Sequence, residues 1–197
     1  MKSLRIAVCL IALAATASNA GAQNVPGKPA QPANPLIEFN RMVYDRLQGI
    51  LLASAEKMPE ENYAFKPTDA VRSYGQILGH VADAQYLFCS IAAGEKNPGT
   101  KFEETKSSKA DLIAALKDAF AYCNKVYEGV TDASSTQTVK LFGGDTPRLG
   151  VLTVNSLHSI EHYGNLVTYM RLKNIVPPTS EPGFRPSASG DNQQPKK

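Results

Sequence analysis

Three histidines are the residues of this chain whose type and spacing could do chemistry. His158 and His162 stand four positions apart, and His80 lies in a separate segment. Residues four apart share one face of a helix, so the imidazoles of His158 and His162 could bind a single cation. A third imidazole from a second helix would complete a three-histidine site. We therefore expect His80, His158 and His162 to bind one divalent metal ion.

Helical periodicity places all three histidines on core-facing stripes. The residues that share these stripes are Ile77, Ala84 and Phe88 around His80, and Val151, Leu166 and Tyr169 around the pair. A lone histidine on an apolar face is more often a hydrogen-bonded core residue. Two adjacent buried imidazoles, however, leave polar nitrogens to satisfy and repel each other when protonated. A metal ion removes both costs, so the pattern favours metal binding over plain burial.

Four further side chains are candidates for supporting roles. Asn155, Asn165 and Asp83 lie on or beside the histidine stripes and could orient an imidazole from outside the ligand set. A solvated or helix-lining role is as good an explanation for each of them. Glu161 flanks the histidine pair and is the candidate general base.

The run from His158 to His162 also matches the inverted zinc-peptidase motif H-x-x-E-H, in which Glu161 would act as the base. His80 speaks against this alternative, because it offers a third ligand that the peptidase arrangement does not need.

Four segments have the periodicity and end signals of amphipathic helices, which predicts an all-α four-helix bundle. They span residues 36–57, 73–93, 108–129 and 146–173. Ser73 and Gln76 form a capping-box sequence at the start of the second segment. Residues 139–144 look like a short extended piece without a partner strand, and Thr146–Pro147 looks like the start of the last helix.

The flanks of this bundle have a different composition. Residues 1–22 read as a basic, apolar and then small-residue secretory signal, 23–35 as a proline-rich linker, 36–178 as the folded domain, and 179–197 as a disordered tail. We therefore expect a periplasmic or secreted protein with no stable membrane span. Cleavage removes Lys2 and Arg5 and lowers the formal charge from +3 to +1, which leaves no basic stripe for nucleic acid.

The two cysteines that remain after signal cleavage relate the expected export of the protein to the directions of its helices. After signal cleavage, Cys89 and Cys123 are the only cysteines, and an oxidising compartment permits a disulfide between them. Two buried free thiols are the alternative. The cysteines lie at similar depths in the second and third helical segments. They match in height only if those helices run parallel, in an up-down-down-up order with a crossover over residues 95–107.

Three stretches give the chain a resemblance to the DinB-like superfamily of four-helix-bundle metalloproteins. They are Tyr63–Pro67 with Val71–Val81, the histidine pair, and Leu166–Pro178. The resemblance implies that His80, His158 and His162 hold a divalent ion such as zinc or nickel, with open positions for water or substrate. It also implies that some relatives are thiol-dependent transferases or isomerases, while many have no known reaction.

The sequence thus leads to an exported metal-binding protein, with a metal-dependent enzyme of the thiol-dependent transferase or hydrolase type as the main hypothesis. A non-catalytic metal- or ligand-binding bundle is the alternative from another class. The small-molecule substrate or ligand is not identified by the sequence, and a homodimer stays open as the oligomeric state.

Overall fold

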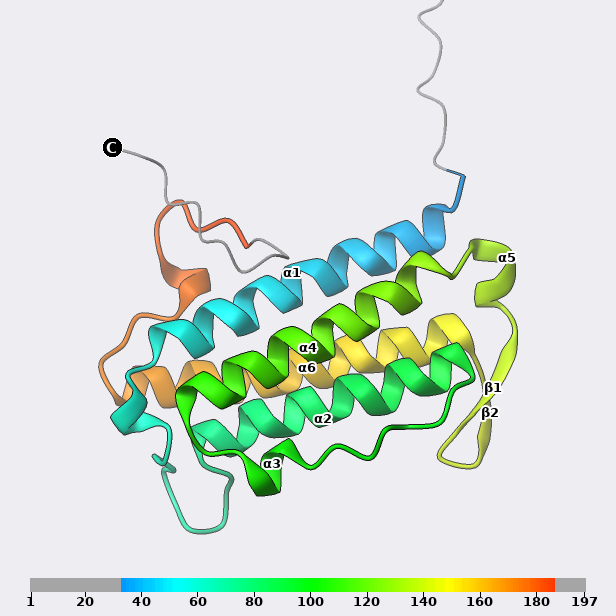
Figure 1. Cartoon of the computed structure of the whole chain (residues 1–197). Helices are drawn as coiled ribbons and strands as arrows, with labels where there is room; N and C mark the ends of the chain where they lie inside the picture. Colours follow the sequence, from blue (N-terminus) through cyan, green and yellow to red (C-terminus); the bar gives the residue numbers. More distant parts are fainter. Residues whose placement is uncertain (1–32, 187–197) are drawn as a thin grey trace, which may run out of the picture. The chain divides into compact units, whose positions relative to one another are not determined.

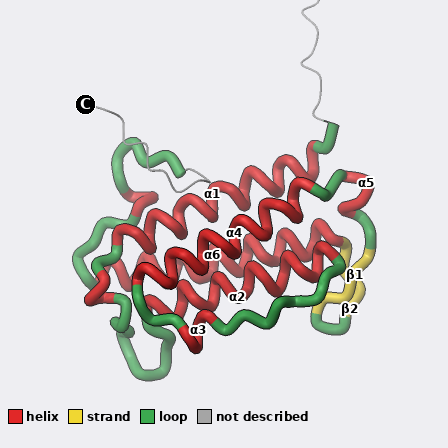
Figure 2. The backbone as a smooth tube through the Cα atoms, viewed as in Figure 1, coloured by secondary structure: helices red, strands yellow, loops and turns green. Residues whose placement is uncertain are grey.

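The computed structural model of the chain describes residues 33–186. Its four long helices are α1 (Pro35–Lys57), α2 (Tyr74–Ala93), α4 (Lys109–Glu128) and α6 (Arg148–Leu172). They pack against one another as a bundle (Figures 1 and 2), so the expected all-α bundle is confirmed. The short elements are η1 (Glu60–Asn62), α3 (Phe102–Thr105), α5 (Asp132–Ser135), β1 (Thr138–Leu141), β2 (Gly144–Pro147) and η2 (Pro178–Ser180).

The predicted flanks fall mainly outside the described residues. The signal segment 1–22, most of the linker 23–35 and residues 187–197 of the tail lie there, and the four predicted segment boundaries stay predictions. Within residues 33–186, no helix has an apolar stretch of the length that a bilayer crossing requires.

The ends of the helices follow from local sequence. The Ser73 hydroxyl accepts from the Gln76 amide, and the Gln76 side chain accepts from the Ser73 amide, so the predicted capping box is present. Gly94 ends α2 with a left-handed φ of 74°, a conformation that glycine adopts without steric cost. The second helix is therefore fixed at both ends, and it carries His80 in its second turn.

Helices α2 and α4 run in the same direction. Near their first turns, a Cβ built on Gly75 would lie 3.1 Å from Leu112 Cδ1. Near their last turns, Cys89 and Cys123 form the predicted disulfide, with a Cα–Cα distance of 5.4 Å. The connection over residues 94–108, which includes α3, must therefore return along the bundle, as Figure 1 shows.

Helix α6 runs opposite to α2. At one end Arg148 Nη2 donates to the Ala93 carbonyl at 3.2 Å. At the other end the Tyr169 hydroxyl donates to the Arg72 carbonyl at 2.9 Å. This direction brings His80, near the start of α2, beside the middle of α6.

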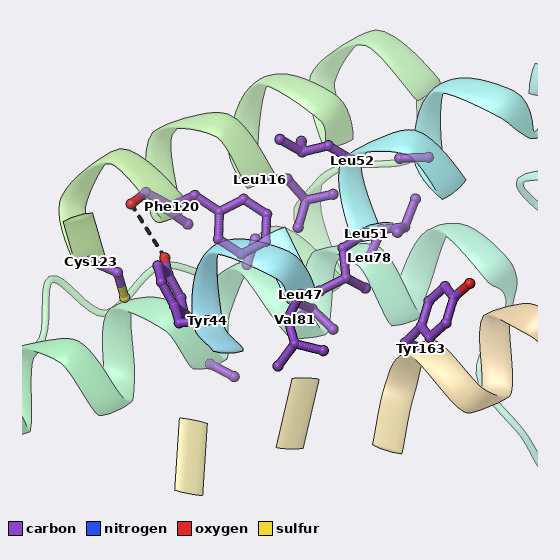
Figure 3. Packing of buried hydrophobic residues seen from close by; sticks show 14 of the residues in the cluster. Tyr44, Leu47, Leu51, Leu52, Leu78, Val81, Leu116, Phe120, Cys123 and Tyr163 are labelled. Atoms are coloured by element: carbon purple, nitrogen blue, oxygen red, sulfur yellow. Dashed lines mark hydrogen bonds between the residues drawn. The ribbon is translucent and has the colours of Figure 1, made fainter. Parts of the chain in front are cut away.

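The core lies between the long helices and is made of large apolar side chains. Figure 3 shows Tyr44 and Leu51 of α1 facing Phe120 of α4 and Leu78 of α2. Tyr44 stacks on the ring of Tyr127 at 4.8 Å and donates its hydroxyl to the Phe120 carbonyl at 3.4 Å. Each fully buried side chain of this size contributes roughly 1.5–3 kcal/mol through removal of apolar surface from water. The core thus supplies a rigid frame for residues on α2 and α6.

The segment before α6 is a β-hairpin. Strands β1 and β2 pair antiparallel, and Phe142 and Gly143 between them have φ angles of 50° and 86°. Two positive φ angles are typical of the two-residue turn that matches the twist of a hairpin. The prediction of an extended piece without a partner was therefore wrong. Thr146 and Pro147, which are predicted to start the last helix, belong to β2, and α6 begins at Arg148.

The chain stays in contact with the bundle beyond Pro178. The Thr179 hydroxyl lies 2.7 Å from the Tyr163 hydroxyl of α6, Glu181 forms an ion pair with Lys57, and Phe184 packs against the core. Residues 179–186, placed in the tail by composition, thus cover one end of the bundle.

Candidate metal centre

The three histidines meet between α2 and α6. His158 Nε2 lies 3.1 Å from His80 Nε2 and 3.1 Å from His162 Nε2. One ring nitrogen from each histidine can serve as a ligand, and these three atoms lie within 4.8 Å of one another. The three imidazoles therefore converge on one point, as the sequence predicted. The four-residue spacing on α6 and the antiparallel direction of α2 bring them together.

The separation of the nitrogens suits a shared ion. Ligands about 2.0–2.1 Å from a tetrahedral zinc ion lie about 3.3 Å apart. Without an ion, His158 Nε2 faces two other ring nitrogens and can exchange a hydrogen bond with each only in particular tautomers. Its Nδ1 is buried and has no hydrogen-bond partner among residues 33–186. The donor set therefore fits a divalent cation better than it fits a network of hydrogen bonds.

The surroundings of His158 and His162 favour the neutral form of these two imidazoles, as metal binding requires. Burial, then the neighbouring His162 and His80, lower the pKa of His158 from 6.5 to about 4. Burial and His80 also lower the pKa of His162, whose side chain is almost fully enclosed. Near neutral pH, His158 and His162 are thus both neutral, and each has one nitrogen lone pair that is free of a proton.

A carboxylate that the sequence analysis missed completes the site. Glu103, on the four-residue helix α3, places Oε2 2.8 Å from His80 Nδ1. Its other oxygen accepts from Arg72 Nε at 2.7 Å. Burial alone would raise the pKa of Glu103, but the hydrogen bonds from Arg72 and His80 lower it below its usual value. The ionised carboxylate accepts a hydrogen bond from the Nδ1–H group of His80 and so leaves the Nε2 lone pair of His80 facing the site.

Two residues of α2 hold Glu103 in place. Both carboxylate oxygens of Asp83 accept backbone amides, from Phe102 at 2.9 Å and from Glu103 at 3.0 Å. Gly79 lets the short helix approach, because a Cβ at this position would lie 2.7 Å from the Glu103 Cα. A glycine inside a helix, next to a candidate ligand, was the signal for such a close approach. Asp83, a candidate for a supporting role, therefore contacts the backbone of α3 and not an imidazole.

The other predicted residues have different positions. Asn165 Nδ2 lies 3.4 Å from His162 Nδ1, so it is beside the site. Asn155 is buried away from the imidazoles and donates to Gln85 Oε1 at 2.7 Å. The side chain of Glu161 is exposed and forms no hydrogen bond or ion pair with another side chain of residues 33–186. Its role as a base stays a prediction, whereas Glu103 is the carboxylate in contact with a histidine.

A cavity of about 590 Å³ opens beside the histidines. His162 and Glu103 form one part of its wall, and the segment from Lys66 to Arg72 forms another. Tyr169, which shares the stripe of the histidine pair on α6, also contributes to it. Ligand pockets for small molecules commonly have volumes of 300–1,000 Å³, so the site has room for a substrate.

Comparison with known proteins agrees with this geometry. The family model of the DinB superfamily matches residues 44–166, a span that contains all three histidines. The chain belongs to the DinB superfamily. The resemblance noted from three sequence stretches is thereby confirmed.

Two Bacillus proteins are similar to this DinB chain. The uncharacterised protein YjoA of Bacillus subtilis is 28% identical in an alignment of 122 residues, and the match covers 59% of this chain and 77% of YjoA. Its crystal structure, described as DinB-like, matches with a TM-score of 0.58 at 23% identity over 74% of this chain and 98% of YjoA. A DinB-like protein of Bacillus cereus matches with a TM-score of 0.66 at 16% identity, covering 72% and 95% of the two chains. These structures establish the shared fold.

Substitution Glu103→Gln in this DinB chain is expected to weaken metal binding about 10–100-fold, the usual cost of losing a hydrogen bond that orients a ligating histidine. The amide keeps the shape of the carboxylate but no longer favours the required tautomer of His80. Competition titration against a chromophoric chelator would measure the change. Glu104→Gln, the adjacent and more exposed residue of α3, serves as the control, and equal affinities of the two variants would contradict the assigned role.

Proposed function

We propose that this chain is an exported DinB-like protein that binds one divalent metal ion, zinc or nickel, through His80, His158 and His162. The observation that supports the proposal is the convergence of three imidazole Nε2 atoms at the edge of an open cavity. Imidazole is a suitable ligand for both metals. The disulfide between Cys89 and Cys123 supports the proposal of export, since such bonds persist in oxidising compartments.

We further propose a metal-dependent enzyme of the transferase or hydrolase type, in preference to a non-catalytic bundle. Three protein ligands leave coordination positions free, and a metal ion held there would supply Lewis-acid chemistry and lower the pKa of a bound water or thiol. The chain's own residues bind the substrate and orient the metal ligands. Glu103 holds the ring of His80, and His162 forms part of the cavity wall. A purely structural site would need no such cavity beside it.

The zinc-peptidase alternative has less support. It requires Glu161 beside the histidine pair as a base and leaves His80 without a role. His80 instead lies with the pair, and Glu161 is exposed to solvent.

The proposal is tested by metal analysis of the protein purified from its native compartment. We expect one zinc or nickel ion per chain, removed by a strong chelator and restored by adding the metal. The protein is then screened against thiol and ester substrates before and after this treatment. Activity that depends on reconstitution supports an enzyme. A protein that carries no metal contradicts the metal site, and activity that chelation leaves unchanged contradicts the metal-dependent mechanism.

A further inference from the structure

Arg72 is the charged residue of the cavity whose hydrogen-bonding capacity is least used. Its guanidinium carries five N–H donors, and only Nε is engaged, with Glu103 Oε1 at 2.7 Å. No hydrogen bond joins its two Nη groups to any residue of 33–186. The side chain is 44% exposed and forms part of the cavity wall. Up to four donors of a permanent cation are therefore accessible to a molecule in the cavity.

The position of Arg72 is fixed from two sides. Its carbonyl accepts from the Tyr169 hydroxyl of α6 at 2.9 Å, and the next residue, Ser73, is the N-cap of α2. Its guanidinium is held by the carboxylate of Glu103 on α3. A surface arginine that only formed an ion pair would not need these backbone contacts. Preorganisation of this kind lowers the entropic cost of binding a ligand.

The other charged groups near Arg72 do not accept hydrogen bonds from its two Nη groups. The two oxygens of Glu103 are occupied by Arg72 Nε and His80 Nδ1. Asp69 pairs with Lys66 at 2.9 Å, and its side chain is fully exposed. The cavity wall thus presents a guanidinium without offering it a second carboxylate. Planar guanidinium groups bind oxyanions through two parallel N–H donors.

We infer that Arg72 binds the oxyanion group of a small-molecule ligand, a carboxylate or a phosphate, whose other functional group reaches His80, His158 and His162. The inference rests on the proposed metal site and names the substrate class for it. A small acid with a metal-binding group at its other end fits both walls of the cavity.

The test uses cobalt-substituted protein and pairs of thiol probes that differ only in charge. Mercaptoacetate and mercaptopropionate are titrated beside the corresponding amides, and binding is followed by the visible spectrum of the cobalt ion. A charge-assisted hydrogen bond is worth about 1.5–3 kcal/mol, so one of the acids is expected to bind about 10–100-fold more tightly than its amide. Inorganic phosphate, added as a competitor, distinguishes a general oxyanion site from one that takes carboxylates alone.

The Arg72→Gln variant is expected to bind acid and amide about equally, and Arg72→Lys, which keeps the charge but not the paired donors, to show a several-fold smaller preference. Lys101→Gln removes a positive charge from an exposed residue beside α3 and is expected to keep the full preference. Equal binding of acid and amide by the cobalt protein, or an unchanged preference in Arg72→Gln, would overturn the inference and leave the metal site intact. A protein that takes up no cobalt would overturn both.

Discussion

Substitution of His158 by alanine is expected to abolish metal binding near neutral pH. His158 Nε2 is the central atom of the site, 3.1 Å from the corresponding nitrogen of each of the other two histidines. Its loss leaves one imidazole from each helix, without the pair of donors one turn apart that the helix α6 provides. The loss of affinity should exceed the roughly 10–100-fold that removal of an outer hydrogen-bond partner costs.

Metal content after dialysis against limiting free zinc or nickel measures this effect. Thermal unfolding gives an independent readout, because a metal that binds only the folded chain raises its stability by about 2.7 kcal/mol at a hundredfold excess over the Kd. That increase should be absent in His158→Ala. The matched control is Glu161→Gln, on the same turn but exposed, which should keep its metal. Full metal content in His158→Ala would refute the three-histidine site.

Replacement of the two disulfide cysteines is the second change for which we expect a large effect, here on stability. The bond joins Cys89 and Cys123 over a separation of 34 residues, and both side chains are fully buried. Breaking the bond increases the conformational entropy of the unfolded chain, which lowers the free energy of unfolding by about 3–4 kcal/mol for a loop of this size. For a domain of this size we expect the double variant Cys89→Ser, Cys123→Ser to melt roughly 8–15 °C lower.

Urea unfolding followed by circular dichroism measures the free energy. Wild-type protein kept under reducing conditions is the control, and it should resemble the double variant. Equal midpoints for oxidised and reduced wild type would contradict the expected stabilisation. Two thiols titrating in the native, unreduced protein would show that the bond is absent.

Much of the site followed from periodicity in the sequence. A four-residue interval fixes the relative positions of two side chains on a helix, so the pair on α6 was predictable before any tertiary contact was known. His80 followed from its apolar stripe. The same regularity predicted the long helices, and the matching depths of two cysteines predicted that α2 and α4 run parallel.

What the sequence analysis missed lies where periodicity is absent. Glu103 sits on a helix of four residues inside a connection, and its position depends on Asp83 and on the missing side chain at Gly79. These are contacts between segments, and no repeat in the sequence encodes them. The β-hairpin was missed for a related reason. Its two strands have four residues each, and its turn residue Gly143 lies within the segment 139–144 that was predicted to be a single extended piece.

The disulfide also has a consequence for the route by which the chain folds. Parallel helices joined by a crossover form contacts between residues far apart in sequence, and such contacts slow folding, because loop-closure entropy is lost before the contacts form. In the oxidised chain Cys89 and Cys123 are neighbours even when the chain is unfolded, so the ends of α2 and α4 meet without a search. The bond makes the pairing of the ends of α2 and α4 local, and it encloses α3 with Glu103 in the same ring.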